Sequence, residues 1–244
     1  MQFTYLDLVD KTILFEPLMA KNWFENNSGG YSLFTSDETQ PYTIPGYYGN
    51  RCIVEIDMAQ ALSRIHQELK TKGLSLKVYD TYRPQKAVSF FTQWTTWPDT
   101  SLAKKYHYPN VQKQNFHELS YLSQTSSHTL GTAVDVTIAP LKYASYEKPA
   151  DFLGYFDSES LDMGVGYLCF DEKSWRSYDQ ITKEQKANRQ ILFDIMDKHG
   201  FEPLDTEFWH YYYKRNRNCD KYFDFDIRDN YKNKELAALG VKRP

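Results

Sequence analysis

The sequence predicts an α+β domain in which helices flank a central, mostly antiparallel β-sheet. Segments with helical and with strand-like apolar periodicity both occur, but they do not alternate as the strand–helix–strand units that build a parallel sheet. The chain has 244 residues, enough for one domain with a substantial core, and it contains no internal repeat or low-complexity linker. We therefore expect a single domain over residues 1–244.

The first half of the chain is predicted to begin irregularly and then to form a helix and a strand. Residues 1–50 show little periodicity and several turn signals, so they are expected to be an irregular lead-in with one short strand, packed on the domain. A helix is predicted over 56–72, closed by Gly73. Its apolar positions recur at helical spacing and are Met58, Leu62, Ile65 and Leu69. Residues 74–79 then alternate in polarity like a half-buried strand.

A second helix is predicted after this strand, because Pro84 suits the first turn of a helix. The helix is expected to end near Trp97-Pro98, since proline cannot continue it. Its inward-facing side chains are predicted to be Ala87, Val88, Phe91 and Trp94. The polar segment 98–125 is expected to form loops with short helical pieces.

The second half is predicted to hold two strands and one helix around an irregular segment, 140–180. A strand over 133–138 places Val134, Val136 and Ile138 on one face and Ala133, Asp135 and Thr137 on the other. Thr182 and Gln185 form the capping-box pattern that opens a helix, and Gly200 closes it. The apolar stripe of that helix is Ala187, Ile191, Leu192, Ile195 and Met196. Residues 208–213, dense in aromatics, predict the last strand.

The composition argues against nucleic-acid and membrane partners. Hydrophobic residues make up 41% and charged residues 25%, as in globular proteins, and the net charge of −3 comes without a basic block. No stretch approaches the roughly 20 apolar residues of a membrane span, and acidic residues interrupt the first twenty positions, where a secretory signal needs an apolar run. The expected location is the cytoplasm. The three cysteines are far apart and suit a reducing compartment as small buried side chains: Cys52, Cys169 and Cys219.

Two of the six histidines have an acidic residue at a usable distance along the chain. Asp135 follows His128 by seven residues and lies on a predicted strand, although Asp is a poor strand former. Catalytic zinc takes three N or O ligands and leaves a fourth position for water, and His128 and Asp135 offer two such ligands. A solvent-facing Asp in an edge strand explains the same residues. The other four histidines have structural or undetermined roles: His66, His107, His117 and His199.

Glu207 and His210 form the second pair. Residues three apart face opposite ways in a regular strand, so these two side chains reach one site only if the chain bulges between them or Glu207 precedes the strand. The alternative is an exposed Glu and a core His. Arg83 lies at a predicted strand-to-helix turn, where its guanidinium is suited to hold a carboxylate or a developing oxyanion. A surface salt bridge, worth under ~1 kcal/mol, is the alternative for Arg83.

Three motifs occur in order along the chain: Tyr82-Arg83-Pro84, then Ser126-Ser127-His128 continuing to Asp135, then Glu207-Phe208-Trp209-His210. Together they resemble the signatures of the zinc D-alanyl-D-alanine dipeptidases of the VanX type, in the DD-peptidase/hedgehog-like superfamily. The likeness runs from about residue 48 to residues 222–225. The joint occurrence of S-x-H-x(6)-D and E-x-W-H in this order is highly specific.

The resemblance implies the fold of that superfamily and a set of roles. It implies that His128, Asp135 and His210 bind one Zn²⁺ per chain, although such a ligand set also suits Mn²⁺ or Co²⁺. Glu207 is implied as the catalytic base, Arg83 as the group that stabilises the oxyanion, and Ser126 as part of the substrate pocket. The implied activity is hydrolysis of D-alanyl-D-alanine or a related D,D-dipeptide in peptidoglycan precursor turnover, with a small peptide containing D-amino acids as the substrate.

The sequence departs from the family pattern at two pocket positions. An Asp that helps to hold the substrate ammonium is expected five residues after Met163, where Leu168 stands, and the nearest acid is Asp171. Met19 falls where a pocket-lining Tyr is expected. Loss of the carboxylate removes a contact worth ~1.5–3 kcal/mol.

These departures leave two alternatives to the dipeptidase. One is a D,D- or L,D-carboxypeptidase of the same superfamily that acts on longer peptides. The other is a zinc-stabilised binding domain without turnover, against which the intact Glu207 and Arg83 argue. The sequence leaves the oligomeric state open.

Overall fold

A five-stranded sheet forms the centre of the part of the chain that the computed structural model describes, namely residues 1–16, 18–19, 33, 43–142, 146–214 and 222–239. Its strand order is β2-β4-β5-β7-β6. The strands are β2 (Leu14–Phe15), β4 (Leu74–Asp80), β5 (Ala133–Pro140), β6 (Phe201–Leu204) and β7 (Glu207–Tyr213). All neighbours are antiparallel except β2 and β4, which are parallel. The predicted α+β class with a mostly antiparallel sheet is confirmed.

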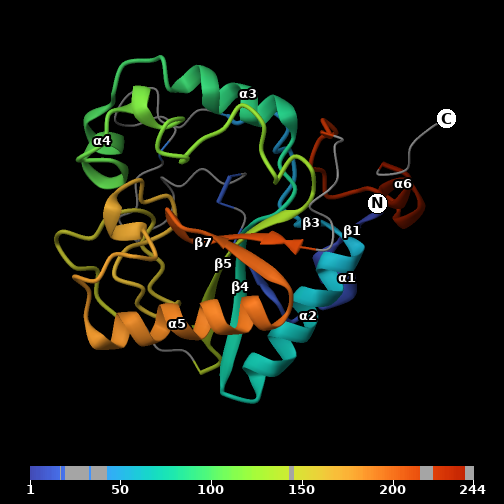
Figure 1. The fold of residues 1–244 in the computed structure, drawn as a ribbon. Helices are drawn as coiled ribbons and strands as arrows, with labels where there is room; N and C mark the ends of the chain where they lie inside the picture. Colours follow the sequence, from blue (N-terminus) through green and yellow to red (C-terminus); the bar gives the residue numbers. More distant parts are fainter. Residues whose placement is uncertain (17, 20–32, 34–42, 143–145, 215–221, 240–244) are drawn as a thin grey trace.

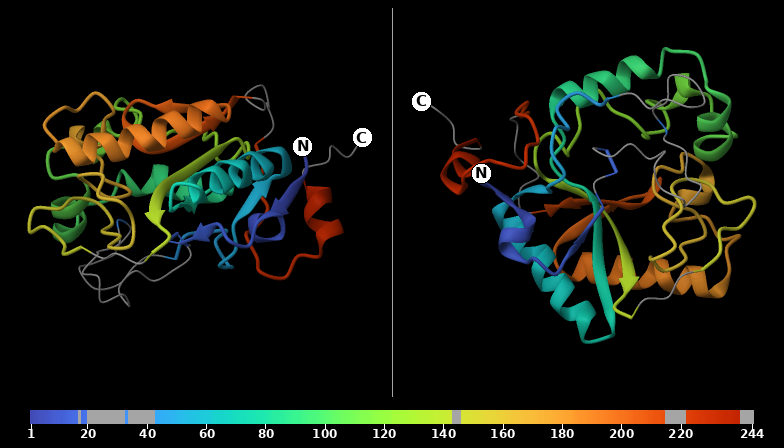
Figure 2. Two further views of the ribbon diagram at one scale, coloured as in Figure 1. Left: turned by 90° about the horizontal axis from the view of Figure 1, so that it is seen from below. Right: turned by 180° about the vertical axis from the view of Figure 1, so that it is seen from behind.

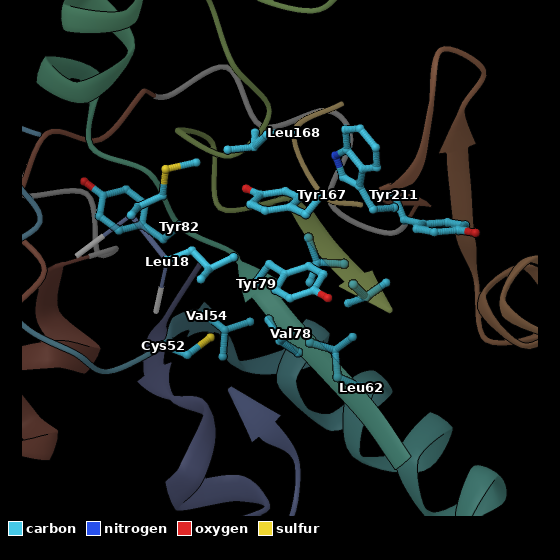
Figure 3. Close-up of a cluster of buried hydrophobic side chains, with 14 of the residues drawn as sticks. Leu18, Cys52, Val54, Leu62, Val78, Tyr79, Tyr82, Tyr167, Leu168 and Tyr211 are labelled. Atoms are coloured by element: carbon cyan, nitrogen blue, oxygen red, sulfur yellow. The ribbon is translucent and has the colours of Figure 1, made fainter. Parts of the chain in front are cut away.

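Helices cover the sheet from two sides (Figure 1; Figure 2). Helices α2 (Ile56–Lys70) and α5 (Lys183–Lys198) lie together on one side, where α2 packs on β4 and α5 on β6. Helices α3 (Gln85–Trp94) and α4 (Ser101–His107) lie across the opposite side. Val78 and Val136 pair across β4 and β5, and Figure 3 shows Val78 on the α2 side of the sheet. The predicted division of β5 into an apolar and a polar face is therefore confirmed.

Both long helices begin at side-chain caps, although only one cap was predicted. The capping box of Thr182 and Gln185 opens α5 as expected. Helix α2 is capped by Glu55, whose carboxylate accepts from the backbone nitrogens of Asp57 and Met58 at 2.9 and 3.1 Å. All four predicted apolar positions of α2 are buried. Gly73 follows α2 with a φ of 73°, as its predicted role as a helix stop requires.

Three predictions about the helices and strands are wrong in detail. Ala187 is exposed, because the first turns of α5 pack on a loop: the buried Asn188 donates to the carbonyl of Asp162 at 2.9 Å. Helix α3 ends at Trp94 rather than near Trp97. Just after this end, Thr95 Oγ1 donates to the carbonyl of Thr92 in the last turn. Strand β4 is buried on both faces rather than half-buried, because Tyr155, Asp157 and Tyr167 of a later segment contact its Tyr79 and Lys77.

The N-terminal lead-in is more regular than predicted. Strand β1 (Phe3–Tyr5) pairs antiparallel with β3 (Ile53–Glu55), helix α1 (Leu6–Val9) follows β1, and β2 extends the main sheet. A C-terminal helix, α6 (Asn233–Leu239), packs on β1. Two 3₁₀ turns, η2 (Lys113–Asn115) and η3 (Glu172–Ser174), complete the described elements.

Two of the three cysteines have the environment expected of them. Cys52 and Cys169 are free and buried, whereas Cys219 lies outside the described residues. In the described part of the chain, no helix combines the length and the apolar character that a membrane crossing requires.

Gly166 allows two backbone segments to approach each other closely. An added Cβ would lie 1.8 Å from the carbonyl oxygen of Tyr155, whose backbone forms a bridge with Tyr167. Gly166→Ala is therefore expected to lower the free energy of unfolding by about 3 kcal/mol or more, because backbone has to move. Denaturant unfolding measures this loss.

Gly73→Ala is the matched control for this prediction. Gly73 also has a positive φ, but nothing lies within 4 Å of its added Cβ, so only the backbone conformation is penalised, by about 1–2 kcal/mol. Equal losses of stability in the two variants would contradict the account of Gly166.

Candidate metal centre and substrate cavity

Three buried side chains from three places in the chain converge at the centre of the sheet. His128 lies in the turn before β5, Asp135 on β5 and His210 on β7, directly opposite Asp135 in the strand register. Nδ1 of His210 is 3.0 Å from Oδ1 of Asp135 and 3.2 Å from Nε2 of His128. His128 Nε2 is 3.3 Å from the same Asp135 oxygen. Because β5 lies between β4 and β7, the edge-strand interpretation of Asp135 is wrong.

This donor set fits a zinc ion. N and O ligands about 2.0–2.2 Å from a tetrahedral Zn²⁺ lie about 3.3–3.6 Å apart, close to the separations of these three atoms. His128 Nδ1 is 2.5 Å from the carbonyl oxygen of Thr81, which directs Nε2 towards the other two side chains. Two imidazoles and one carboxylate are typical ligands of zinc.

The protonation states of two of these groups also suit metal binding. Burial opposes ionisation of Asp135, but the charges and hydrogen bonds of His128 and His210 hold its pKa below the usual range. Burial lowers the pKa of His210, although Asp135 acts in the opposite direction. These directions favour the ionised carboxylate of Asp135 and the neutral imidazole of His210, the forms in which the two groups bind a metal.

Glu207 and His210 face the same site because β7 is irregular. Pro203 of β6 pairs with Tyr211, but Leu204 pairs with Glu207, so the register shifts between these pairs. Oε2 of Glu207 lies 3.9 Å from Nδ1 of His210. Of the two arrangements that the spacing allowed, a bulge or a Glu207 that precedes the strand, the structure has the bulge. Burial, followed by the charge of Asp135, raises the pKa of Glu207 well above its usual value and makes its carboxylate more basic.

Arg83 is held beside His128, Asp135 and His210, called the triad below, rather than on the surface. Its Nε and one terminal nitrogen lie 3.0 and 2.9 Å from Oδ2 of Asp80, and that terminal nitrogen is 3.5 Å from Oδ2 of Asp135. Asp80 is buried and accepts from the hydroxyl of Tyr47 at 3.0 Å. The surface salt-bridge interpretation of Arg83 is therefore wrong. Asp80 was not predicted as a site residue, although an acid three residues before an arginine at a strand end is a usable signal.

A cavity of about 380 Å³ opens above these residues. Arg83, Glu207 and the triad line one part of it. Ser126 lines the wall, and its hydroxyl accepts from the backbone nitrogen of His128 at 3.2 Å, so it also shapes the turn that carries this histidine. The apolar part of the wall includes Met19, Val88, Phe91, Leu122, Leu168 and Phe170.

Leu168 occupies the cavity wall without a neighbouring carboxylate to replace the expected Asp. Asp171 is buried elsewhere, where it accepts from Asn110 Nδ2 at 2.8 Å and from the backbone nitrogen of Lys173 at 3.1 Å. Among the described residues that line the cavity, the only carboxylates belong to Asp135 and Glu207. The pocket wall at Leu168 is thus apolar.

The remaining histidines lie outside the triad. Buried His66 contacts the backbone nitrogen of Leu76 at 3.3 Å, and His199 at the end of α5 lies 3.0 Å from Glu68. These contacts agree with the structural roles expected for both. Nδ1 of His107 is 3.0 Å from the carbonyl oxygen of Leu168, and His117 lines the cavity.

Comparison with known proteins gives consistent matches. A model of the Peptidase M15 family, described as D-Ala-D-Ala dipeptidase, matches residues 40–228. The chain is 30% identical over 185 residues to a D-alanyl-D-alanine dipeptidase of Enterococcus faecium, covering 76% of this chain and 85% of that one. It is 31% identical over 184 residues to a D-alanyl-D-alanine dipeptidase of Streptomyces coelicolor, covering 75% and 84%.

A solved structure is also among the matches. It is a mutant of the vancomycin-resistance D,D-pentapeptidase VanY, from the VanB-type resistance cassette, in complex with Zn(II). The sequence identity is 18% and the TM-score 0.37, with 76% of this chain and 89% of that chain covered.

Proposed function

The chain belongs to the Peptidase M15 family of D-Ala-D-Ala dipeptidases, and we propose that it is a zinc-dependent D,D-dipeptidase that hydrolyses D-alanyl-D-alanine or a related D,D-dipeptide in peptidoglycan precursor turnover. The observation that carries this proposal is the position of the Glu207 carboxylate. Its Oε2 lies 3.9 Å from Nδ1 of His210, in a cavity that His128 and Asp135 also line. We further propose that the whole chain forms one peptidase domain, because β1 and α6, from opposite ends of the described chain, pack together.

The proposed ligands are His128, Asp135 and His210. When bound there, Zn²⁺ acts as a Lewis acid that lowers the pKa of a water molecule and polarises the scissile carbonyl. The raised pKa of Glu207 makes its carboxylate a suitable acceptor for the proton that leaves the attacking water. As the bond between the carbonyl carbon and the amide nitrogen breaks, Glu207 returns that proton to the leaving amine. The products are two free amino acids.

Arg83 is proposed to stabilise the negative charge that develops on the carbonyl oxygen. Its pairing with Asp80 fixes the guanidinium beside the cavity, so little reorganisation is needed when the oxyanion forms. Burial opposes the charge of Arg83, but Asp80 and other neighbouring groups outweigh burial and raise its pKa well above the usual value, so this group keeps its charge. Ser126, on the same cavity wall, is proposed to contact the substrate.

The apolar wall at Leu168 favours a second candidate, a carboxypeptidase of the same superfamily that acts on longer or blocked peptides. A free substrate ammonium gains most from an ionised partner, and the described cavity wall offers no carboxylate apart from Asp135 and Glu207.

Comparison of D-Ala-D-Ala with its N-acetylated form separates the two candidates. The dipeptidase proposal expects a higher kcat/KM for the free dipeptide than for the acetylated form. Equal or faster turnover of the acetylated form would reject the dipeptidase in favour of the carboxypeptidase. Zinc binding without hydrolysis of any D,D- or L,D-peptide would reject both.

A further inference from the structure

The two carboxylate oxygens of Asp135 have separate surroundings. Oδ1 faces His128 Nε2 and His210 Nδ1 at 3.3 and 3.0 Å. Oδ2 accepts from the hydroxyl of Tyr167 at 2.9 Å. Arg83 approaches the same oxygen at 3.5 Å. One oxygen is thus directed to the proposed metal position, whereas the other is held by neighbouring side chains.

The ring of Tyr167 is fixed from two sides. It stacks on Tyr79 with ring centroids 4.8 Å apart and an interplanar angle of 18°, and the two parallel rings are visible in Figure 3. Trp209 meets it edge-on at 5.7 Å. The backbone is anchored as well, because the carbonyl of Tyr167 accepts from the nitrogen of Tyr155 at 2.7 Å and the next residue, Leu168, has a φ of 59°. The hydroxyl therefore has one well-defined position.

Tyr79 reaches Tyr167 because β4 bulges. The register between β4 and β5 shifts between Val78 and Asp80, so Tyr79 and Asp80 together oppose Asp135 and share its face of the sheet. The hydroxyl of Tyr79 donates to Asp157 Oδ2 at 2.9 Å, and Lys77 Nζ contacts that oxygen at 2.5 Å. A buried ion pair thus secures the ring on which Tyr167 stacks.

We propose that Tyr167 is a positioning residue that holds Asp135 as a one-oxygen ligand, and this inference rests on the proposed metal site. A carboxylate that binds zinc through both oxygens occupies the coordination position that a catalytic site leaves for water. By holding Oδ2, the Tyr167 hydroxyl keeps Oδ1 alone directed to the metal. Contacts of this kind to metal ligands typically change metal affinity by about 10–100-fold.

Tyr167→Phe tests the proposal, with Tyr79→Phe as the matched control. Each variant removes one buried hydroxyl and keeps the stacked ring, but only Tyr167 touches a proposed ligand. The zinc dissociation constant, measured by competition with a chromophoric chelator, is expected to rise about 10-fold or more in Tyr167→Phe and to change less than about 3-fold in Tyr79→Phe. The visible d–d bands of the Co²⁺-loaded protein are expected to weaken only in Tyr167→Phe, because a second carboxylate oxygen raises the coordination number.

Three outcomes would overturn the inference or its premise. Wild-type zinc affinity and unchanged Co²⁺ bands in Tyr167→Phe would show that the hydroxyl does not hold the ligand. Equal losses of affinity in both variants, in proportion to the lost stability of the metal-free proteins, would show a merely structural role. If the unmodified protein bound no zinc, the proposed metal site itself would be wrong. Measuring the unmodified protein therefore distinguishes a failure of the metal site from a failure of the role given to Tyr167.

Discussion

Glu207→Ala is expected to lower D-Ala-D-Ala hydrolysis by about 10²–10⁴-fold, the range typical of a lost general base, while zinc stays bound at one ion per chain. The reason is that Glu207 lies 3.9 Å from His210 without belonging to the group of three converging ligand atoms. Glu207→Gln keeps the shape of the side chain and is expected to lose as much activity. Hydrolysis rates and metal content measured on the same samples check both expectations.

Glu202→Ala is a suitable control for this prediction. Glu202 lies half-buried on the neighbouring strand β6 and is not among the described residues that line the cavity, so near-normal turnover is expected. Near-normal turnover in Glu207→Gln would show that another group accepts the proton. Loss of zinc from Glu207→Gln would show instead that Glu207 is a ligand.

His210→Ala is expected to lose both zinc and activity. His210 Nδ1 lies within 3.2 Å of His128 Nε2 and 3.0 Å of Asp135 Oδ1, so its removal leaves only two of the three proposed ligands. The loss of zinc affinity should exceed the roughly 10–100-fold that is typical of contacts outside the ligand set. Equilibrium dialysis against Zn²⁺, followed by metal analysis, measures it.

His66→Ala separates this effect from a general loss of stability. His66 is as buried as the triad, but it contacts Leu76 and Thr12 instead of a proposed ligand. This variant is expected to be less stable in denaturant yet to bind zinc with unchanged affinity. If both histidine variants lost zinc equally, His210 would have no special role in binding the metal.

The sequence predicted best what depends on local spacing. The period-two pattern of β5 correctly separated Val136 from Asp135, and the capping box correctly placed the start of α5. Ala187 was predicted wrongly, because the packing of a loop on the first turns of α5 decides its exposure and periodicity does not record that contact.

The geometry of the site depends on how the strands pair, and the sequence of a single strand does not predict its neighbours or its register. Whether Asp135 is buried follows from the position of β5 between β4 and β7, and the shared orientation of Glu207 and His210 follows from the register shift against β6. Spacing alone therefore did not decide whether His128 and Asp135 lie in one site with Glu207 and His210. The resemblance in three motifs was needed to predict a shared site. Asp80 and Tyr167 were missed because a bulge and an aromatic stack bring them to the site.

Titration of the metal-free protein with Zn²⁺, with D-Ala-D-Ala hydrolysis and bound metal followed together, tests the central proposal most directly. The account predicts negligible hydrolysis without metal, a linear rise with added Zn²⁺ and a plateau at one equivalent per chain. It also predicts no such rise in His128→Ala. Full hydrolysis by the metal-free protein, or a one-equivalent plateau that survives in His128→Ala, would contradict the proposed metal centre.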